Sequence, residues 1–200
     1  MKKYLLAIVA VLMFGTNIRA QKYGPWDMYI GPRAGVVVNN FTTCDGGDYN
    51  IGALAGFNAE VFFTKHISLN MGFNYTRQGY KNLEHYYTSY DYNLDYVNTE
   101  FLFRYYPGYR FCVFTGLDFG RLVRSRIVLE NGSERSINSY LHRGTVAIPV
   151  GMAVNFKNID LNVAYRYQLN KLGRASFNKY IGDAHNQSLT ASIFYKIRLF

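Results

Sequence analysis

Alternation with a period of two residues runs through this chain from about residue 26 to its end, and it restricts the fold more than any other feature. In eight segments, apolar side chains take every second position, and Gly, Ser, Thr, Asn or charged residues take the positions between them. Successive side chains of a β-strand point to opposite faces of a sheet, so the pattern predicts eight strands with one apolar and one polar face each. The segments are residues 26–38, 51–63, 67–79, 94–106, 110–123, 143–156, 159–169 and 188–200.

The connections between these segments alternate in length. Three of them, at 64–66, 107–109 and 157–158, are two or three residues long. The other four, near 39–50, 80–93, 124–142 and 170–187, are each about a dozen residues or more. An even number of antiparallel strands with short turns on one side and long loops on the other is typical of bacterial outer-membrane proteins. The predicted fold class is therefore all-β: an eight-stranded antiparallel transmembrane β-barrel with short periplasmic turns and long outer loops.

Charged residues within the strands decide which face meets lipid, because nearly all of them lie on the polar face. An eight-stranded barrel has an interior just wide enough for side chains. In a soluble barrel such as a lipocalin, the apolar face would fill that interior. The many charged side chains of this chain could not fill a dry soluble core without a large desolvation cost. We therefore expect the apolar face to point outward, toward lipid. We expect the charges to form a network that plugs the barrel rather than a pore. The predicted interior network is Arg33, Glu60, Glu100, Arg104, Asp118, Arg166 and Lys196.

Residues 1–20 have the form of a secretory signal peptide. Lys2 and Lys3 precede an apolar run that ends at Phe14, and a short polar stretch ends at Ala20. The apolar run is too short to cross a bilayer as a helix, which takes roughly 20 residues. The sequence thus predicts a signal peptide at 1–20, a single barrel domain at 21–200, and export to the bacterial outer membrane. The net charge of +9 is a mild excess of basic residues.

Several short strings resemble the PorT-type outer-membrane β-barrel family of Bacteroidetes-like bacteria. They are TKHISL at 64–69, YTRQG at 75–79, LDY at 94–96, and the pair Gly116 and Gly120. The chain departs from the family pattern at Asn98, where an acidic residue is usual, and at Glu100, where proline is usual. The resemblance spans the mature chain and implies the same fold and an accessory role in envelope secretion. Phe200 resembles the terminal aromatic residue read by the barrel-assembly machinery, which implies that machinery as a partner during biogenesis.

Arginines cluster around the predicted outer loop at 124–142, where Glu130 and Glu134 are the only acids. The guanidinium group matches phosphate and carboxylate with two parallel hydrogen bonds. These residues predict either contact with anionic lipopolysaccharide headgroups or a surface polysaccharide, or simply a solvated rim. The secreted, membrane-embedded context argues against nucleic acid as a partner. The residues are Arg121, Arg124, Arg126, Arg135 and Arg143.

Evidence for catalysis in the sequence is weak. His142 near Ser136 or Ser139 could form a nucleophile–base pair, but a solvated loop histidine is the simpler interpretation. Zinc-ligand spacing, a phosphate-binding glycine loop and a nucleophile elbow are all missing from the sequence. We therefore predict a noncatalytic barrel, without metal or cofactor, that has a structural, surface-interaction or secretion-accessory role. The alternatives are a lipid A-modifying outer-membrane enzyme and a small, porin-like ion-permeable pore.

The two cysteines, Cys44 and Cys112, are predicted not to pair. Cys44 falls in the first long loop, whereas Cys112 begins the fifth strand just above a short turn. Their heights should differ by about 25 Å, the height of the apolar band. A disulfide requires Cα atoms within about 7 Å of each other. Cys112 is expected to face the barrel interior.

Overall fold

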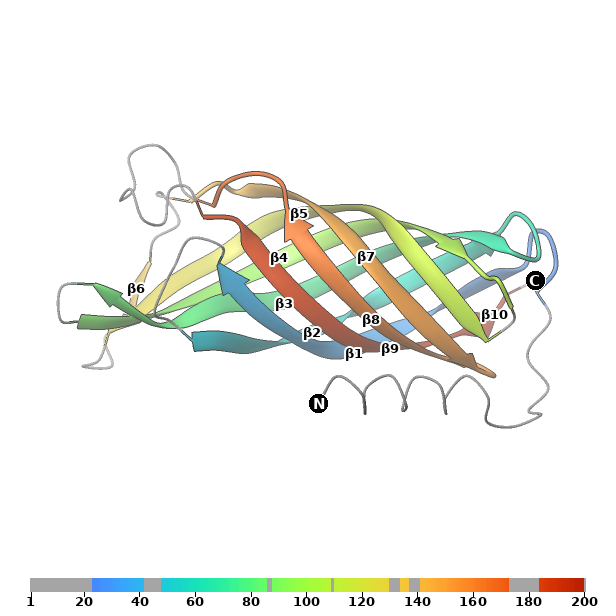
Figure 1. The fold of residues 1–200 in the computed structure, drawn as a ribbon, viewed down its shortest axis with the longest axis horizontal. Coiled ribbons are helices and arrows are strands. Elements are labelled where there is room, and N and C mark those ends of the chain that lie inside the picture. Colours follow the sequence, from blue (N-terminus) through green and yellow to red (C-terminus); the bar gives the residue numbers. More distant parts are fainter. Residues whose placement is uncertain are drawn as a thin grey trace.

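The computed structural model describes residues 23–41, 48–85, 88–108, 110–129, 134–136, 141–172 and 184–199, whose strands form a closed antiparallel β-barrel (Figure 1). Eight strands surround the interior, and the last of them is divided into two sections, β9 and β10. The short strand β6 pairs with β5 outside the barrel wall. The predicted fold class is confirmed. The strands are β1 (Met28–Phe41), β2 (Asp48–Phe62), β3 (Ile67–His85), β4 (Thr88–Tyr105), β5 (Phe111–Leu129), β6 (Glu134–Ser136), β7 (Gly144–Phe156), β8 (Ile159–Gln168), β9 (Asn186–Tyr195) and β10 (Ile197–Arg198).

The barrel closes between its first and last strands. β1 pairs with β9 from Arg33 onward and with β10 at Tyr29 and Ile30, all in one unshifted register. The interruption between the two sections, at Lys196, lies opposite Gly31 and beside Pro32, which has no backbone N–H to donate to the ladder. Closure removes the free sheet edges, so every barrel strand has a neighbour on both sides.

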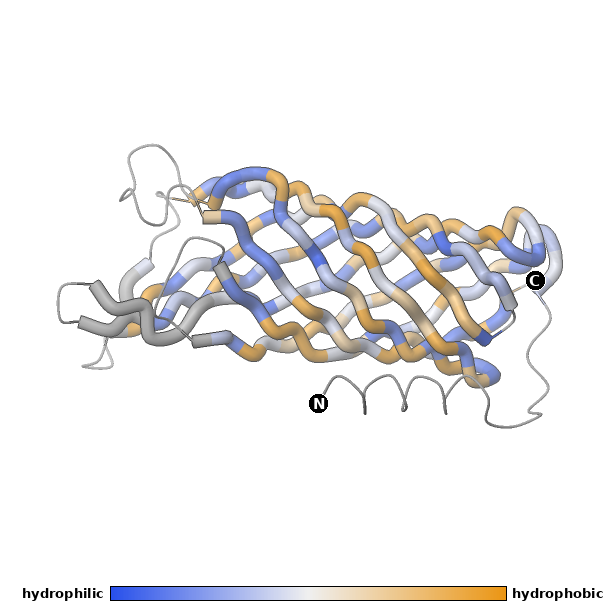
Figure 2. Tube along the Cα trace, viewed as in Figure 1, coloured by the Kyte–Doolittle hydropathy of each residue, from blue (hydrophilic) through white to orange (hydrophobic). Residues whose placement is uncertain are grey.

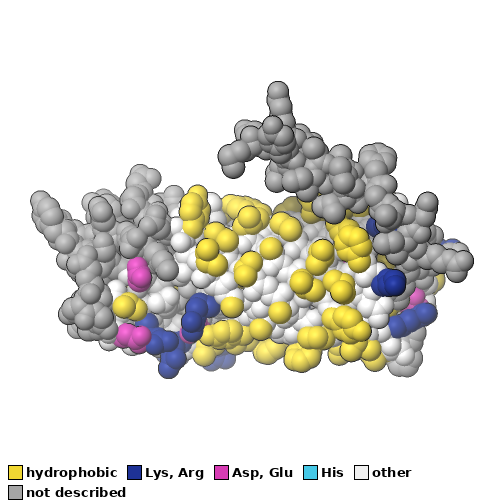
Figure 3. Space-filling model, turned by 90° about the horizontal axis from the view of Figure 1, so that it is seen from below, with side chains coloured by type: hydrophobic (Ala, Val, Ile, Leu, Met, Phe, Trp, Pro, Cys, Tyr) yellow, Lys and Arg dark blue, Asp and Glu magenta, His cyan; other side chains and the backbone are white. Residues whose placement is uncertain are grey.

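Burial in the barrel is inverted relative to a soluble protein. Along β8, exposed Ile159, Leu161 and Val163 alternate with buried Asp160 and Asn162. Figure 2 shows the same alternation of hydrophobic and hydrophilic residues along the other strands. On the surface, hydrophobic side chains cover the middle of the wall, and charged side chains gather near its two ends (Figure 3). The polar face therefore forms the interior, and the apolar face forms a band around the barrel.

The two ends of the barrel differ in how the chain crosses them. At the end named here the short-turn end, the hairpins close through residues 63–66, 106–110 and 157–158. Residue 23 and the C-terminal strand section also lie at this end, because Leu199 N donates to Met28 O and Trp26 N donates to Phe62 O. The opposite end, the long-loop end, carries the extended hairpins on the left of Figure 1. No helix of the described residues is long and apolar enough to cross a membrane.

Two of the expected loops are wrong, because the strands continue into them. β3 continues to His85, β4 begins at Thr88, and β5 continues to Leu129. Much of 80–93 and 124–142 is therefore paired strand. Register shifts between Tyr80 and Leu83 and between Asp95 and Tyr96 change which residues face inward. A shift of one residue exchanges the two faces, so a search for unbroken alternation ends there although the pairing does not.

Space inside the wall is set by small inward residues opposite large ones. Gly151 on β7 faces Phe114 on β5, and a Cβ atom on Gly151 would lie 2.5 Å from Phe114 Cζ. The absence of a side chain at Gly151 thus makes room for the Phe114 ring. Cys112, two residues earlier on β5, is buried in the interior with a free thiol, and Cys44 lies outside the described residues.

Candidate functional site: the barrel interior and the arginine rim

Four charged residues form a compact cluster inside the short-turn end, named here the base layer. Lys196 Nζ lies 2.8 Å from Glu60 Oε2 and 3.1 Å from Asp160 Oδ2. Arg104 Nη1 lies 2.5 Å from Asp160 Oδ2 and 3.4 Å from Glu60 Oε2. Each charge therefore contacts two opposite charges, and the layer is neutral as a whole. All four side chains are almost completely buried.

Aromatic rings enclose this base layer on the side of the short-turn end. Tyr23 and Phe62 stack with ring centroids 4.0 Å apart, and Tyr106 lies 5.2 Å from Phe62. Tyr106 donates a hydrogen bond to Glu60 at 2.6 Å. The Lys196 ammonium lies within 5.2–5.9 Å of the centroids of five rings, which gives cation–π attraction in a desolvated setting. These rings belong to Tyr23, Tyr29, Phe62, Tyr106 and Phe194.

Tyr23 reaches the base layer from the segment that precedes β1. Its hydroxyl donates to Asn155 Oδ1 at 3.1 Å and accepts a hydrogen bond from Lys196 Nζ. Burial raises the pKa of the Tyr23 phenol, so the hydroxyl stays protonated and can act as this donor. Asp27 holds the same segment in place by accepting bonds from Gly24 N and from the Arg198 guanidinium. The segment 23–27 therefore covers the short-turn end of the interior.

A second neutral cluster, the middle layer, lies further along the barrel. Arg33 Nη1 is 2.5 Å from Glu100 Oε2, and Arg166 Nη2 is 3.1 Å from Glu100 Oε1. Arg166 also forms an ion pair with Asp118. Ser192 accepts a hydrogen bond from Arg33 Nε at 3.0 Å. Two arginines and two carboxylates again balance, which satisfies the buried charges at this level.

The structure places all seven predicted interior residues in these two layers. The sequence analysis missed Asp160 as a member of the base layer and Tyr23 as part of its cover. Asp160 alternates with the apolar residues of β8, so its inward orientation can be read from the period of two. Tyr23 lies before the first alternating segment, and no local pattern marks it as buried.

An apolar cluster lies at the long-loop end of the interior. Its backbone frame joins three segments: His142 N donates to Leu172 O, and Leu172 N donates to Ala184 O, both at 3.0 Å. The cluster fills the region beside the extended parts of β4 and β5. It was not predicted, because it begins at the register shift near Asp95. Its buried members are Tyr92, Leu94, Tyr96, Leu122, Leu141, Leu172 and Ala184.

Two of the predicted arginines, Arg121 and Arg143, line the same pocket at the long-loop end of the wall. Arg121 on β5 is paired in register with Gly144, and Leu122 N donates to the carbonyl of Arg143 at 2.7 Å. Arg121 and Arg143 line a pocket of about 350 Å³ together with Leu122 and Val123. Arg124 follows on the same outer face of β5, and all three arginines are exposed. We name Arg121, Arg124 and Arg143 the arginine rim; among the described residues, none of the three forms an ion pair.

The other arginines of the predicted cluster do not join this rim. Arg126 lies higher on β5 and pairs with Glu134 of β6 at 2.5 Å. Arg135 belongs to β6, but its side chain lies outside the described atoms. The expectation that these residues sit in a loop is wrong for Arg124 and Arg126, which are strand residues. Sequence reasoning missed Arg77 on β3, which faces outward and pairs with Asp95 at 3.1 Å.

Aromatic side chains lie directly next to the arginine rim on the lipid side of the wall. Tyr75 and Arg121 are both cross-strand partners of Val97, and Phe73 and Phe119 are both partners of Thr99 in the adjacent row. Phe101 and Phe119 contact edge to face, with centroids 6.3 Å apart. Exposed aromatic rings beside charged groups are typical of the membrane–water interface.

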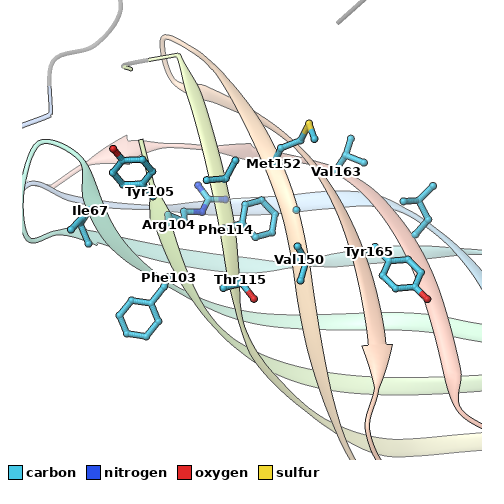
Figure 4. Close-up of a pocket in the computed structure, with 13 residues that line it drawn as sticks. Ile67, Phe103, Arg104, Tyr105, Phe114, Thr115, Val150, Met152, Val163 and Tyr165 are labelled. Atoms are coloured by element: carbon cyan, nitrogen blue, oxygen red, sulfur yellow. The ribbon is translucent and has the colours of Figure 1, made fainter. Parts of the chain in front are cut away.

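A shallow groove of about 780 Å³ crosses the wall outside β4, β5, β7 and β8 (Figure 4). It runs between two cross-strand rows, one through Thr115 and Val150 and the other through Val113 and Met152. Its outer margin includes Phe103 and other large apolar side chains, and the outward polar groups in its lining are the hydroxyls of Tyr105, Thr115 and Tyr165. The groove therefore offers mainly apolar contact.

The described residues assemble no catalytic constellation from the predicted candidates. His142 is exposed beside β7, and Ser136 belongs to the β5–β6 hairpin with no hydrogen bond between their described side chains. Ser139 lies outside the described residues. His66 Nδ1 is 2.8 Å from Tyr106 O in a short turn, and His185 stacks on Tyr167. In the described ranges, no three His, Cys, Asp or Glu residues are placed to hold a metal ion.

Comparison with known proteins identifies the family. The family model described as "Outer membrane protein beta-barrel domain" matches residues 27–173, which is more than half of the chain. The chain belongs to this family. The match covers β1 to β8, and therefore most of the barrel wall. No curated protein matches the sequence.

Solved structures of outer-membrane proteins share the fold of this family member. The Ail attachment invasion locus protein of Yersinia pestis is 15% identical, with a TM-score of 0.53 over 86% of this chain and 99% of that chain. Neisserial surface protein A is 17% identical, with a TM-score of 0.54 over 85% of this chain and 97% of that chain. At these identities the likeness concerns the fold alone.

Family membership gives the described geometry its orientation. In bacterial outer-membrane barrels the short turns are periplasmic and the long loops are extracellular. The base layer and Tyr23 therefore lie toward the periplasm, and the arginine rim lies at the outer boundary of the apolar band. The chain is thus an outer-membrane barrel with a polar, charge-filled interior.

Proposed function

We propose that this protein is an exported, noncatalytic outer-membrane barrel that does not conduct ions and that acts through contacts of its outer surface with anionic glycolipid or polysaccharide. The signal peptide at 1–20 would be cleaved during export. The barrel-assembly machinery would then insert the barrel, because Phe200 resembles the terminal aromatic residue that this machinery reads. The observation that carries the proposal is the filling of the interior by the base layer, the middle layer and the outer apolar cluster.

A filled interior supports a structural or surface role over a pore. Ions would have to pass two layers in which every charged group is already paired, such as Lys196 with Glu60 and Asp160. Opening either layer would separate buried opposite charges, which costs several kcal/mol for each unpaired group. Above these layers, ions would also meet the apolar cluster around Leu94 and Leu122.

The long-loop end presents three arginines that form no ion pair with the described residues. Arg121 and Arg124 lie on the outer face of β5 and Arg143 is exposed beside them, and a guanidinium group binds phosphate, sulfate or carboxylate well. Ail of Yersinia pestis, which shares the fold, has been solved in complex with the heparin analogue sucrose octasulfate. That complex supports the proposal that a barrel of this fold can bind an anionic partner. The PorT-type motifs add a possible accessory role in secretion, which rests on the sequence strings alone.

Planar-bilayer recording tests the absence of conduction. We expect the purified wild-type barrel to give no steady conductance steps. A variant that lacks one carboxylate and one cation of each layer, Glu60→Ala, Lys196→Ala, Glu100→Ala and Arg166→Ala, serves as the comparison and should conduct more than the wild type. Steady steps from the wild-type protein would contradict the proposal and favour a pore.

Lipid A from a deletion strain separates the barrel from an enzyme. We expect mass spectra of lipid A to be the same with and without the gene, because the described residues bring together no nucleophile and base. A difference in the acyl or phosphate groups of lipid A between the deletion strain and the wild-type strain would contradict the noncatalytic assignment, if the wild-type gene reverses it.

A further inference from the structure

We propose that Arg121 and Arg143 form a binding site for the phosphate group of a glycolipid in the outer leaflet, of the lipid A class, held against the outside of the β5–β7 wall. This inference rests on the proposed function and names the partner of its outer surface. It commits to a membrane-embedded phosphorylated lipid and not to a soluble polysaccharide.

The charge balance around the pocket points to an anion. The β5–β7 pairing brings Arg121, within β5, close to Arg143, directly before β7, and both line the pocket of about 350 Å³. Neighbouring arginines are neutralised within the protein: Arg77 by Asp95 and Arg126 by Glu134. Asp95, the cross-strand partner of Arg124, already forms an ion pair with Arg77, so Arg121 and Arg143 keep a local positive charge without an ion pair among the described residues. Two guanidinium groups at one pocket suit a phosphate, which can accept several charge-assisted hydrogen bonds.

The height of the pocket points to a lipid. Arg121 lies one cross-strand row above Phe119, and Phe119 packs against Phe101 within the apolar band. A molecule whose phosphate binds at Arg121 can therefore lay its acyl chains against exposed aromatic rings immediately below. β5 places Arg121 on the outer face of the wall, in the same cross-strand row as Tyr75, so its side chain leaves the barrel on the lipid side.

The distribution of charge around the barrel shows that the site belongs to one side. The described outward side chains of β1, β2, β8 and β9 are all uncharged, such as Val38, Tyr49 and Tyr167. Among the barrel-strand side chains that the structure describes, outward charges lie on β3, β4 and β5, with Arg143 directly before β7. A rim that only needed solvation would have no reason to concentrate arginines on a single side. The asymmetry fits one bound lipid at one position of the wall.

Native mass spectrometry of the folded barrel tests the site with defined lipids. The probes are bisphosphorylated lipid A, the same lipid A after removal of its phosphates, and the phosphorylated polysaccharide released from lipopolysaccharide. The test variant is Arg121→Gln with Arg143→Gln. The matched control is Lys65→Gln with Lys157→Gln, which removes the same charge from two exposed residues of the short turns. The heat-dependent gel shift of folded barrels shows that each variant is folded before lipid is added.

We expect the arginine variant to bind lipid A about tenfold more weakly than the wild type, which corresponds to about 1.4 kcal/mol. Removal of the phosphates should weaken binding to the wild type by a similar factor and leave binding to the variant unchanged. The lysine control should bind lipid A as the wild type does. Equal binding of lipid A by the arginine variant and the wild type would overturn the site.

The polysaccharide probe distinguishes failure of this inference from failure of the proposed function. If released polysaccharide binds as well as lipid A and loses binding in the arginine variant, the lipid assignment is wrong and the proposed surface contact stands. If the wild type retains neither lipid A nor polysaccharide, the lipid site and the proposed anionic contact are both wrong.

Discussion

Lys196 is one of the two cations of the base layer, and its ammonium contacts both Glu60 and Asp160. Replacement by Met keeps much of the side-chain volume but leaves two buried carboxylates with Arg104 as their remaining cation. Breaking a buried ion pair by removing one partner costs about 3–5 kcal/mol. We expect Lys196→Met to lower the free energy of unfolding by that amount.

Urea unfolding in phospholipid vesicles measures this loss, with the fluorescence of Trp26, the single tryptophan of the chain, as the signal. Lys65→Met, in an exposed short turn, is the control and should change the free energy of unfolding by less than about 0.5 kcal/mol. Adding Glu60→Gln to Lys196→Met removes one uncompensated charge and should recover part of the stability. A Lys196→Met barrel as stable as the control variant would show that the base layer contributes nothing.

Among elements, β7 contains two glycines whose surroundings differ sharply, Gly151 and Gly144. A Cβ atom on Gly151 would meet Phe114 Cζ and Val163 O, both at 2.5 Å. We expect Gly151→Ala to lower the free energy of unfolding by about 1–3 kcal/mol through overpacking. Gly144→Ala, on the same strand, meets no atom within 4 Å and should have little effect. Equal urea midpoints for the two variants would contradict the packing described here.

The elements also show where sequence reasoning succeeds and where it fails. Period-two alternation located all eight strands and the three short turns, because a narrow barrel forces each inward position to differ chemically from its outward neighbours. It failed beyond Tyr80 and at Asp95, where register shifts exchange the faces while the pairing continues. The pocket between Arg121 and Arg143 could be predicted only as a cluster, because the pairing of β5 with β7 brings the two residues together.

At the scale of the whole molecule, the polarity of the outward side chains must follow the polarity of the membrane from its apolar centre to its interfaces. Phe101 and Phe63 are similarly exposed, at 39% and 41%, but Phe101 lies within the apolar band and Phe63 lies at a short turn. An arginine costs about 2–4 kcal/mol at the bilayer midplane and about 0–1 kcal/mol near an interface. We expect Phe101→Arg to destabilise the vesicle-inserted barrel clearly more than Phe63→Arg. Equal unfolding free energies for the two variants in vesicles would argue against the proposed position of the band.

Because Lys196 lies between β9 and β10, the base layer is complete only after nearly all of the barrel has been synthesised. Glu60 is placed early by β2 and Asp160 late by β8, yet the ammonium that balances them arrives only with the final strand. A chain that stops before residue 196 would lack this ammonium and leave both carboxylates with Arg104 as their cation. We therefore expect truncated products to be less stable than the complete barrel.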